Sequence, residues 1–375
     1  MKIGFLCNSP SWGGLEINNY KLAQWLTERG HEVVMIAHSD YPIYKHSRDA
    51  GLPLIHFPAR YKDLSLRACM RLSKTNKTEK FDTLILGVNQ DIKLGVLTKK
   101  FGLGKTLLIY HQQIELGVNK RDFWHTSIYK SLDAWVTPLE VLANQVRERT
   151  NIDPDKIKII PLCIDVNRFS ENKMKMQEAR ENLDLPQEEL IIGMVGRMDH
   201  QKGHAYFIEA LGELRKKDIE VKGLICGVKE EDKGSEYLKS LESLAEKNGL
   251  KDQIYFRPFS KDVETAYKAM NIFVMASPAE TFGMVTVEAL ACGVPVVGTN
   301  HLGTKEILKS GDYGLVFPPR DAKALSNCLE ELIDDELLTS TLAAKGVDYV
   351  KSTYNFTRQC ELFEQLITEL KEKRG

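Results

Sequence analysis

A strand followed by a tight turn and a helix, at residues 272–293, is the feature that most constrains the fold of this chain. The run Ile272–Met275 is short, apolar and partly β-branched, and a Ser-Pro pair follows shortly after it, so it is predicted to be a buried strand. The segment Gly283–Cys292 carries an apolar face at helical spacing and ends at a glycine. This pattern places Glu280 on the turn and Glu288 within the helix.

The spacing of Glu280 and Glu288 indicates two separate binding roles. Eight residues of helix span at most about 12 Å, whereas the carboxylates of a retaining glycosidase lie about 5 to 5.5 Å apart. Each carboxylate is therefore expected to hold one end of an elongated ligand. The N–H groups of residues 281–284 lie between them at a helix N-terminus, where free donors and the helix dipole favour an anion. A sugar, a diphosphate and a ribose would fit in that order.

The length of the chain and the distribution of its charges limit the possible domain organisation. A chain of 375 residues is longer than one core usually supports, so two domains are expected. With 43% hydrophobic and 27% charged residues, the composition is that of a soluble globular protein. Residues 1–165 contain 23 basic and 17 acidic residues, whereas the remainder contains 28 basic and 35 acidic ones. The basic first half predicts an anionic surface or acceptor on that side.

Cysteine usage and the start of the sequence predict a cytoplasmic protein. The seven cysteines are scattered and form no C-x-x-C pair, which is typical of reduced thiols. The chain opens directly into the apolar run Ile3–Cys7 without a signal sequence, and no apolar run approaches about 18 residues. We expect a protein that is neither secreted nor membrane-spanning.

The first half begins like a dinucleotide-binding fold but lacks its fingerprint. Ile3–Cys7 is predicted to be a parallel strand, and a turn containing Gly13 and Gly14 leads into a helix. The absence of G-x-G-x-x-G argues against a dinucleotide cofactor. A glycine pair at such a turn lets the backbone approach a ligand closely, although most such pairs are simply tight turns.

Residues 59–80 form the most basic segment of the chain. Its basic residues are Arg60, Lys62, Arg67, Arg71, Lys74, Lys77 and Lys80. Because apolar residues are interleaved, part of the segment could be an amphipathic helix lying on the anionic inner face of the cell membrane. The alternative is an ordinary solvated helix face. Nucleic acid binding is not expected, because no recognition motif accompanies the charge.

His111 follows the predicted strand Leu107–Tyr110 directly. At the carboxyl end of a parallel strand it would face the crevice in which open α/β sheets bind ligands. The nearby Gly102–Thr106 run lacks the glycine spacing of a phosphate-binding P-loop. The Asp153–Asp155 segment spells D-x-D, but its central proline indicates a loop, so no metal ion is predicted.

The second half restarts the strand–turn–helix pattern at residues 190–195, after a polar connector. Arg197 and Lys202 lie on the turn that follows. A planar guanidinium and a point charge near a helix N-terminus suit a diphosphate. The run Ile254–Phe256 is a further predicted strand, and Arg257 follows it.

Glu280 and Glu288, with Phe282-Gly283 and Gly293–Val297, resemble the E-x7-E signature of the family 4 retaining glycosyltransferases, which use nucleotide sugars and have the GT-B fold. The resemblance spans nearly all of the chain and is most specific in the second half. It implies an α/β protein in which two Rossmann-like domains face an interdomain crevice. The implied organisation is a first domain at 1–165, a connector at 166–189, a nucleotide-sugar domain at 190–350 and a C-terminal helix at 351–375 that packs back on the first domain.

The resemblance also implies the roles of individual residues. The implied catalytic residues are Arg197, Lys202, Glu280 and His111, of which the first two stabilise the departing diphosphate and the last two hold the sugar. The implied donor-binding residues are Gly14, Thr281, Phe282, Gly283, Met284, Val285 and Glu288, with Phe256 and Arg257 near the nucleobase. The nucleotide sugar is a substrate, and neither a cofactor nor a metal ion is expected. Many members glycosylate lipid-linked acceptors, which favours a membrane contact.

Two positions depart from the family pattern, and two alternatives stay open. Leu162-Cys163 replaces the usual Asn-Gly, and Leu302-Gly303 stands where a glycine pair is usual. A nucleotide-sugar epimerase of the same fold would act without an acceptor. A nucleotide-binding scaffold that has lost its chemistry would not turn over the donor at all.

Overall fold

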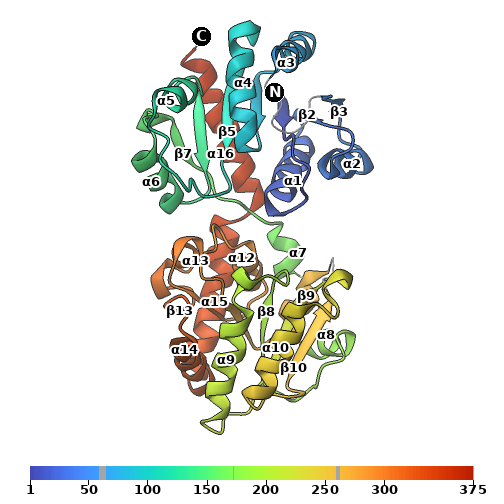
Figure 1. Ribbon diagram of the computed structural model, residues 1–375, viewed down its shortest axis with the longest axis vertical. Coiled ribbons are helices and arrows are strands. Elements are labelled where there is room, and N and C mark those ends of the chain that lie inside the picture. The colour runs from blue at the N-terminus through green and yellow to red at the C-terminus, as the bar shows by residue number, and fades with distance from the viewer. Residues whose placement is uncertain (59–64, 172, 259–261, 375) are drawn as a thin grey trace. The chain divides into compact units, whose positions relative to one another are not determined.

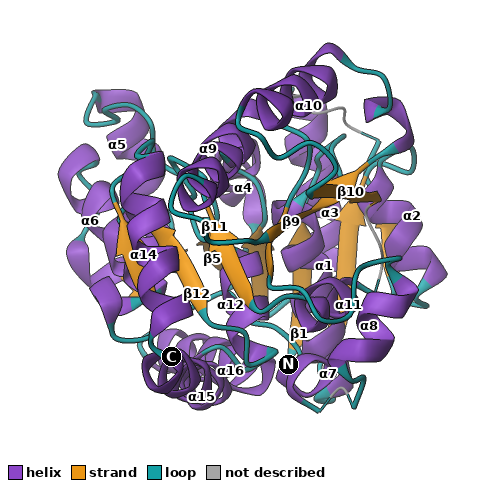
Figure 2. Cartoon of the chain, turned by 90° about the horizontal axis from the view of Figure 1, so that it is seen from below, coloured by secondary structure: helices purple, strands orange, loops and turns teal. Residues whose placement is uncertain are grey.

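The computed structural model describes residues 1–58, 65–171, 173–258 and 262–374. The chain divides into two compact units, Met1–Leu162 with Phe356–Gly375 and Cys163–Asn355. In each unit a parallel sheet lies between helices, as Figure 1 and Figure 2 show. The predicted α/β architecture of two Rossmann-like domains is confirmed.

The first unit contains a seven-stranded sheet in the order β3-β2-β1-β4-β5-β6-β7. The strands are β1 (Lys2–Leu6), β2 (Glu32–Ala37), β3 (Leu54–His56), β4 (Thr83–Leu86), β5 (Leu107–His111), β6 (Ala134–Thr137) and β7 (Ile157–Ile159). The helices are α1 (Gly14–Glu28), α2 (Pro42–Asp49), α3 (Leu66–Glu79), α4 (Asn89–Gly102), α5 (Phe123–Tyr129), α6 (Glu140–Arg149) and α16 (Phe356–Glu372). All neighbouring strands pair in parallel.

Alternation along the strands divides the core of the first unit between two faces. In β5, Leu107 and Ile109 pack with residues of α1, α2 and α16, whereas Leu108 and Tyr110 pack with residues of α3 to α6. Helix α16 is therefore part of the first unit, although it comes last in the chain. Its Glu364 accepts two hydrogen bonds from Arg29, the residue that follows α1, at 2.7 and 2.8 Å.

The second unit contains a six-stranded sheet in the order β10-β9-β8-β11-β12-β13. The strands are β8 (Ile191–Val195), β9 (Lys222–Val228), β10 (Ile254–Pro258), β11 (Ile272–Met275), β12 (Val296–Thr299) and β13 (Leu315–Phe317). The helices are α7 (Val166–Ser170), α8 (Met176–Asn182), α9 (His204–Arg215), α10 (Glu236–Lys247), α11 (Val263–Ala269), α12 (Met284–Ala291), α13 (Leu302–Ile307), α14 (Ala322–Asp334) and α15 (Glu336–Thr353). Helices α7 and α8 occupy the stretch expected to be a connector, and they belong to this unit.

The strand orders define where each sheet can bind a ligand. In the second unit the chain runs from β8 outward to β9 and β10, and from β11 outward to β12 and β13. In the first unit the corresponding reversal lies between β1 and β4. Ligands of open α/β sheets bind beyond the carboxyl ends of the strands at such switch points. A ligand of the second unit is therefore expected beside the residues that follow β8 and β11.

No helix in the described part of the chain is long and apolar enough to cross a membrane. Of the predicted membrane-contacting segment 59–80, residues 59–64 lie outside the described residues, and most of the rest forms α3.

The switch point of the first unit contains a buried carboxyl group. Asp91, near the start of α4, is 4% exposed and accepts a hydrogen bond from the Asn8 N–H at 3.1 Å. Burial raises the pKa of Asp91 to about 8, against the opposing effect of that hydrogen bond. Between its unfolded pKa and pH 8, the folded state therefore binds more protons than the unfolded state. Asp91 costs the folded protein increasing free energy as pH rises through this window.

We expect Asp91→Asn to stabilise the protein, by an amount that grows between pH 5 and pH 8 to a few kcal/mol. Asparagine keeps an oxygen that can accept from the Asn8 N–H and never ionises. Chemical denaturation at both pH values measures the difference. A stability increment that stayed constant with pH would contradict the assignment of a raised pKa to Asp91.

Candidate functional site

The switch point of the second unit brings together two charged residues that were predicted from separate motifs. Lys202 follows β8 and ends the 3-10 turn η2 (His200–Lys202), whereas Glu280 follows β11. The Lys202 Nζ donates to Glu280 Oε2 at 2.7 Å. The strands β8 and β11 are direct neighbours, so the two loops meet at the same edge of the sheet. The ion pair therefore joins the two turns on which the sequence analysis depended.

A glycine allows the loop after β8 to approach β11 closely. Gly203 has a φ of +78°, and a Cβ at this position would lie 2.1 Å from the carbonyl oxygen of Ala276, at the end of β11. Only glycine tolerates this conformation and this distance. Gly203 thus fixes the backbone of the neighbouring Lys202 against β11.

A second glycine holds the loop that carries Glu280. The Gly303 N–H donates to the Glu280 carbonyl at 3.1 Å, and a Cβ on Gly303 would lie 2.4 Å from the carbonyl oxygen of Phe282. The preceding Leu302 has a φ of +42°. This conformation costs a residue with a side chain about 1 to 2 kcal/mol. A glycine at position 302, which the family pattern leads one to expect, would adopt this conformation without that cost. The departure from the pattern therefore leaves Leu302 in a strained backbone conformation.

The start of α12 presents a row of free donors. Gly283 precedes the helix with a φ of +97°. Within the described residues we find no acceptor for the N–H groups of residues 281–285. They are the backbone donors of Thr281, Phe282, Gly283, Met284 and Val285, which the sequence analysis singled out. Together with Lys202 they form a site that favours an anion.

Glu288 lies on the second turn of α12 and is half-buried. It accepts a hydrogen bond from the Tyr267 hydroxyl of α11 at 2.8 Å. Burial of Tyr267, together with the charge of Glu288, holds the pKa of this hydroxyl well above its usual value, so the phenol stays a donor. Tyr267 thus orients the Glu288 carboxylate.

A cavity of about 340 Å³ lies at the carboxyl ends of β8, β9 and β10. It is lined by residues at those ends, such as Val195, Gly227 and Pro258, and by Glu264–Ala266 of α11. Because α11 also carries Tyr267, the cavity lies along the same helix as the partner of Glu288. Sequence reasoning missed Gly227 and Thr265 as site residues, and the only signal for them is their place near the end of a strand and in the first turn of a helix.

Phe256 and Arg257, the predicted nucleobase residues, are not among the residues that line this cavity. Phe256 packs against the core of the unit. Arg257 donates to the carbonyl oxygens of Leu183 and Asp184, and its guanidinium lies 5.4 Å from the centre of the Tyr255 ring. Pro258 is the residue of this strand that reaches the cavity. The contacts of Phe256 and Arg257 with a base remain predictions.

Arg197 differs from Lys202 in its exposure. Its side chain is 71% exposed, and its nearest carboxylate is Asp199, at 3.7 Å. A guanidinium at this distance from a carboxylate can reorient toward a ligand at little cost. Arg197 is thus available to a diphosphate. The Lys202 amine, in contrast, is already paired with the Glu280 carboxylate.

In the first unit, Gly14 opens α1 directly after the turn that follows β1. A Cβ on Gly14 would meet no atom within 4 Å, so the backbone borders open space. The turn is held by Glu16, which accepts from the Ser9 hydroxyl at 2.6 Å and from the Gly13 N–H at 3.0 Å. The glycine turn is therefore a rigid and accessible backbone surface.

His111 is buried, whereas the sequence analysis expected it to face a crevice. Strand alternation continues through β5 and turns the ring onto the face covered by α1 and α16. The ring lies edge-on to Phe363 at 5.3 Å, and its Nδ1 is 3.2 Å from Asn19 Oδ1. Its Nε2 has no partner among the described residues. Burial lowers the pKa of His111 to about 3, so the ring is neutral at physiological pH. Its contact with a sugar remains a prediction.

Residues of both units match family descriptions of glycosyltransferases. Residues 175–348 match "Glycosyl transferases group 1" and residues 12–168 match "Glycosyltransferase Family 4". The chain is 30% identical over 215 residues to the D-inositol 3-phosphate glycosyltransferase of Corynebacterium urealyticum, covering 56% of this chain and 50% of that protein. A match to the protein of the same name from Corynebacterium jeikeium is also 30% identical, over 220 residues. The chain spans about half the length of these curated relatives.

Solved structures share the fold over almost the whole chain. A glycosyltransferase from Rickettsia africae superposes with a TM-score of 0.87 at 19% identity, covering 98% of both chains. HepE of Anabaena, solved in complex with UDP, superposes with a TM-score of 0.86 at 19% identity, covering 98% of this chain and 100% of that one. The family matches confirm the resemblance predicted from the sequence, and the superpositions confirm the fold. The chain belongs to the family 4 glycosyltransferases and has their GT-B fold.

Proposed function

We propose that this glycosyltransferase moves a hexosyl group from a nucleoside diphosphate sugar to an acceptor hydroxyl, with retention at the anomeric carbon and without a metal ion. The observation that carries this proposal is the Lys202–Glu280 pair, at 2.7 Å, beside the free N-terminus of α12. One element of this arrangement attracts an anion and the other accepts hydrogen bonds from hydroxyl groups. A nucleotide sugar carries both groups side by side.

The donor would lie along the carboxyl edge of the second sheet. The sugar hydroxyls would be held by Glu280, and the diphosphate by Arg197, Lys202 and the free N–H groups of α12. The ribose would reach Glu288, and the base would enter the cavity of about 340 Å³ beside α11. The negative charge that develops on the departing diphosphate is stabilised by donors that are already in position, which is where electrostatic catalysis is largest.

The comparisons support the donor class. HepE of Anabaena has been solved with UDP and with UDP-glucose. The related D-inositol 3-phosphate glycosyltransferases are named for an acceptor that is a phosphorylated polyol. For this chain we infer a UDP- or GDP-sugar donor and an acceptor bound on the basic first unit, such as a lipid-linked glycan precursor.

Helix α3 supports a membrane-bound acceptor. Ser65 caps the helix by accepting from the Ala68 N–H. Leu66 and Met70, one turn apart, are 56% and 50% exposed, and Arg67 and Arg71 follow them directly. An exposed apolar pair flanked by arginines is typical of a helix that lies at an anionic leaflet. We propose α3 as a peripheral membrane contact of the enzyme.

The test is release of nucleoside diphosphate from a UDP- or GDP-sugar, with EDTA present, as a function of added acceptor extract. A transferase releases nucleotide only when acceptor is present and transfers the labelled sugar to it. An epimerase would convert the sugar without acceptor, and a scaffold would bind donor without turnover. Either of these last two results would overturn the proposed function.

A further inference from the structure

A second cavity lies on the opposite edge of the first unit from its switch point. It has a volume of about 630 Å³ and is bordered by residues that precede β4 and β5. It is lined by Asn76, Lys77, Lys80, Phe81, Asp82, Gly102, Leu103, Gly104, Lys105, Thr106, Leu107, Lys371 and Arg374. Strand β5 has five residues, so this edge lies about 16 Å from the carboxyl edge of the same sheet. The cavity is therefore distinct from the ligand-binding edge.

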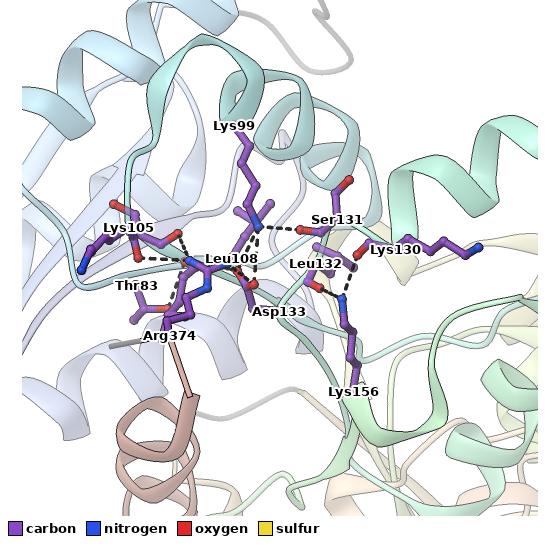
Figure 3. Close-up of polar contacts among 12 residues, drawn as sticks. Thr83, Lys99, Lys105, Leu108, Lys130, Ser131, Leu132, Asp133, Lys156 and Arg374 are labelled. Atoms are coloured by element: carbon purple, nitrogen blue, oxygen red, sulfur yellow. Dashed lines mark hydrogen bonds and ion pairs between the residues drawn. The ribbon is translucent and has the colours of Figure 1, made fainter. Parts of the chain in front are cut away.

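The lining of this cavity contains five cationic side chains and one carboxylate. The carboxylate, Asp82, is already neutralised by Lys371 at 2.5 Å and accepts from the Lys2 N–H at 2.8 Å. Arg374 is committed as well, because it binds the Asp133 carboxylate and the carbonyl oxygens of Lys105 and Thr106 (Figure 3). Asp133 also receives Lys99, at 3.3 Å. The negative charges of Asp82 and Asp133 are therefore already balanced, and the remaining lysines of the lining stay uncompensated.

Three amines of the lining have no carboxylate partner within the described residues, namely Lys77, Lys80 and Lys105. Lys77 crosses the turn after α4, since its Cε lies 3.3 Å from the position that a Cβ on Gly102 would occupy. Lys105 lies on the same turn, one residue after Gly104. The three amines thus come from two adjoining segments and border a single concavity, with an excess charge of three.

The floor of this cavity is anchored in the core, whereas its three unpaired lysines are exposed. Phe81, Leu103 and Thr106 are at most 5% exposed and anchor the floor in the core. Thr106 donates to the Phe81 carbonyl at 2.9 Å, which ties the two loops together.

We propose that this cavity is a second anion site, which binds the phosphate monoester or diphosphate group of a ligand other than the sugar donor. Three amines match the charge of such a group and can donate to its acceptor oxygens. The volume lies within the range of small-molecule sites. The phosphate can come from a free metabolite or from a lipid headgroup, and the experiment separates these sources.

Inorganic pyrophosphate is the probe for the free source, titrated calorimetrically into the full-length protein. The Lys77→Ala/Lys105→Ala variant is expected to bind it at least tenfold more weakly at this site, while Arg197→Ala/Lys202→Ala retains it. The matched control is Lys45→Ala/Lys93→Ala, which removes the same charge from exposed positions of the same unit. Pyrophosphate binding that depends on Arg197 and Lys202 alone, or that falls equally in the control, would overturn the proposal unless the lipid probe binds.

Vesicles of phosphatidylcholine with phosphatidic acid are the probe for the lipid source, with phosphatidylcholine alone as the reference. Co-flotation that needs phosphatidic acid and is lost in Lys77→Ala/Lys105→Ala, but not in the control variant, assigns the site to a headgroup. Binding of pyrophosphate without flotation assigns it to a free metabolite. Failure of both probes would refute the second anion site. Vesicle binding that is lost equally in Lys77→Ala/Lys105→Ala and in the control Lys45→Ala/Lys93→Ala would also refute it.

Discussion

Replacing Lys202 with alanine is expected to lower kcat about 10³-fold with the natural donor and acceptor. Lys202 is the half-buried cation of the switch point, and the departing diphosphate gains negative charge in the transition state. The Lys202 backbone is fixed by the neighbouring Gly203, and its amine pairs with Glu280 at 2.7 Å. Its charge is therefore in position before the reaction begins. Steady-state kinetics on the purified variant measure the loss.

The matched control for this prediction is Lys239→Ala, which removes an exposed lysine of α10 in the same unit. It should leave kcat unchanged. A thermal melt of the Lys202 variant without ligand checks that the unpaired Glu280 does not unfold the unit. A folded Lys202→Ala variant with kcat within threefold of the wild type would remove Lys202 from the catalytic site.

Replacing Glu288 with glutamine is expected to weaken donor binding about 10- to 100-fold, because a hydrogen bond to a charged acceptor is lost. Glutamine keeps an oxygen for the Tyr267 hydroxyl, so the packing of α11 against α12 should survive. The ribose, in contrast, loses one of two carboxylate oxygens. Calorimetric titration with the donor measures the change in Kd.

Tyr267→Phe distinguishes two roles of Glu288, namely direct binding of the ribose and a structural hydrogen bond to Tyr267. This variant removes the hydroxyl that donates to Glu288 but leaves the carboxylate in place. If Glu288 binds the ribose, Tyr267→Phe should weaken the donor by much less than Glu288→Gln. Equal effects on donor affinity, or loss of stability without loss of affinity in Glu288→Gln, would show that the carboxylate serves the fold alone.

Strands of the second unit such as β8 and β11 were predictable because each apolar run there is also a buried strand of the sheet. Residues 272–275 are apolar because they are buried on both faces of a parallel sheet, and the same pattern predicts β11. Glu280 and Lys202 were assigned separately, and the strand order brings them together, because β8 and β11 are neighbours. Their 2.7 Å contact could not be read from the sequence, which carries no information on which loops meet.

The side-chain contacts of His111 and Arg257 could not be predicted from the sequence. The position of His111 at a strand end was correct, but the side to which its ring turns depends on strand alternation through β5. Arg257 follows the apolar part of β10, yet its guanidinium finds two carbonyl oxygens at the end of α8. These contacts are tertiary, between residues more than 70 positions apart. The basic cavity before β4 and β5 escaped notice for the same reason, because Lys371 and Arg374 reach it from the far end of the chain.

Thermal unfolding with a panel of UDP-, GDP- and ADP-sugars, in the absence of metal, tests the central claim most directly. A ligand that binds only the folded state adds about 2.7 kcal/mol at a hundredfold excess over Kd. We predict a rise in Tm with one nucleotide class for the wild type, and its loss in Arg197→Ala/Lys202→Ala. An unchanged Tm with every sugar nucleotide at millimolar concentration would contradict the assignment of the switch point of the second unit as a nucleotide-sugar site.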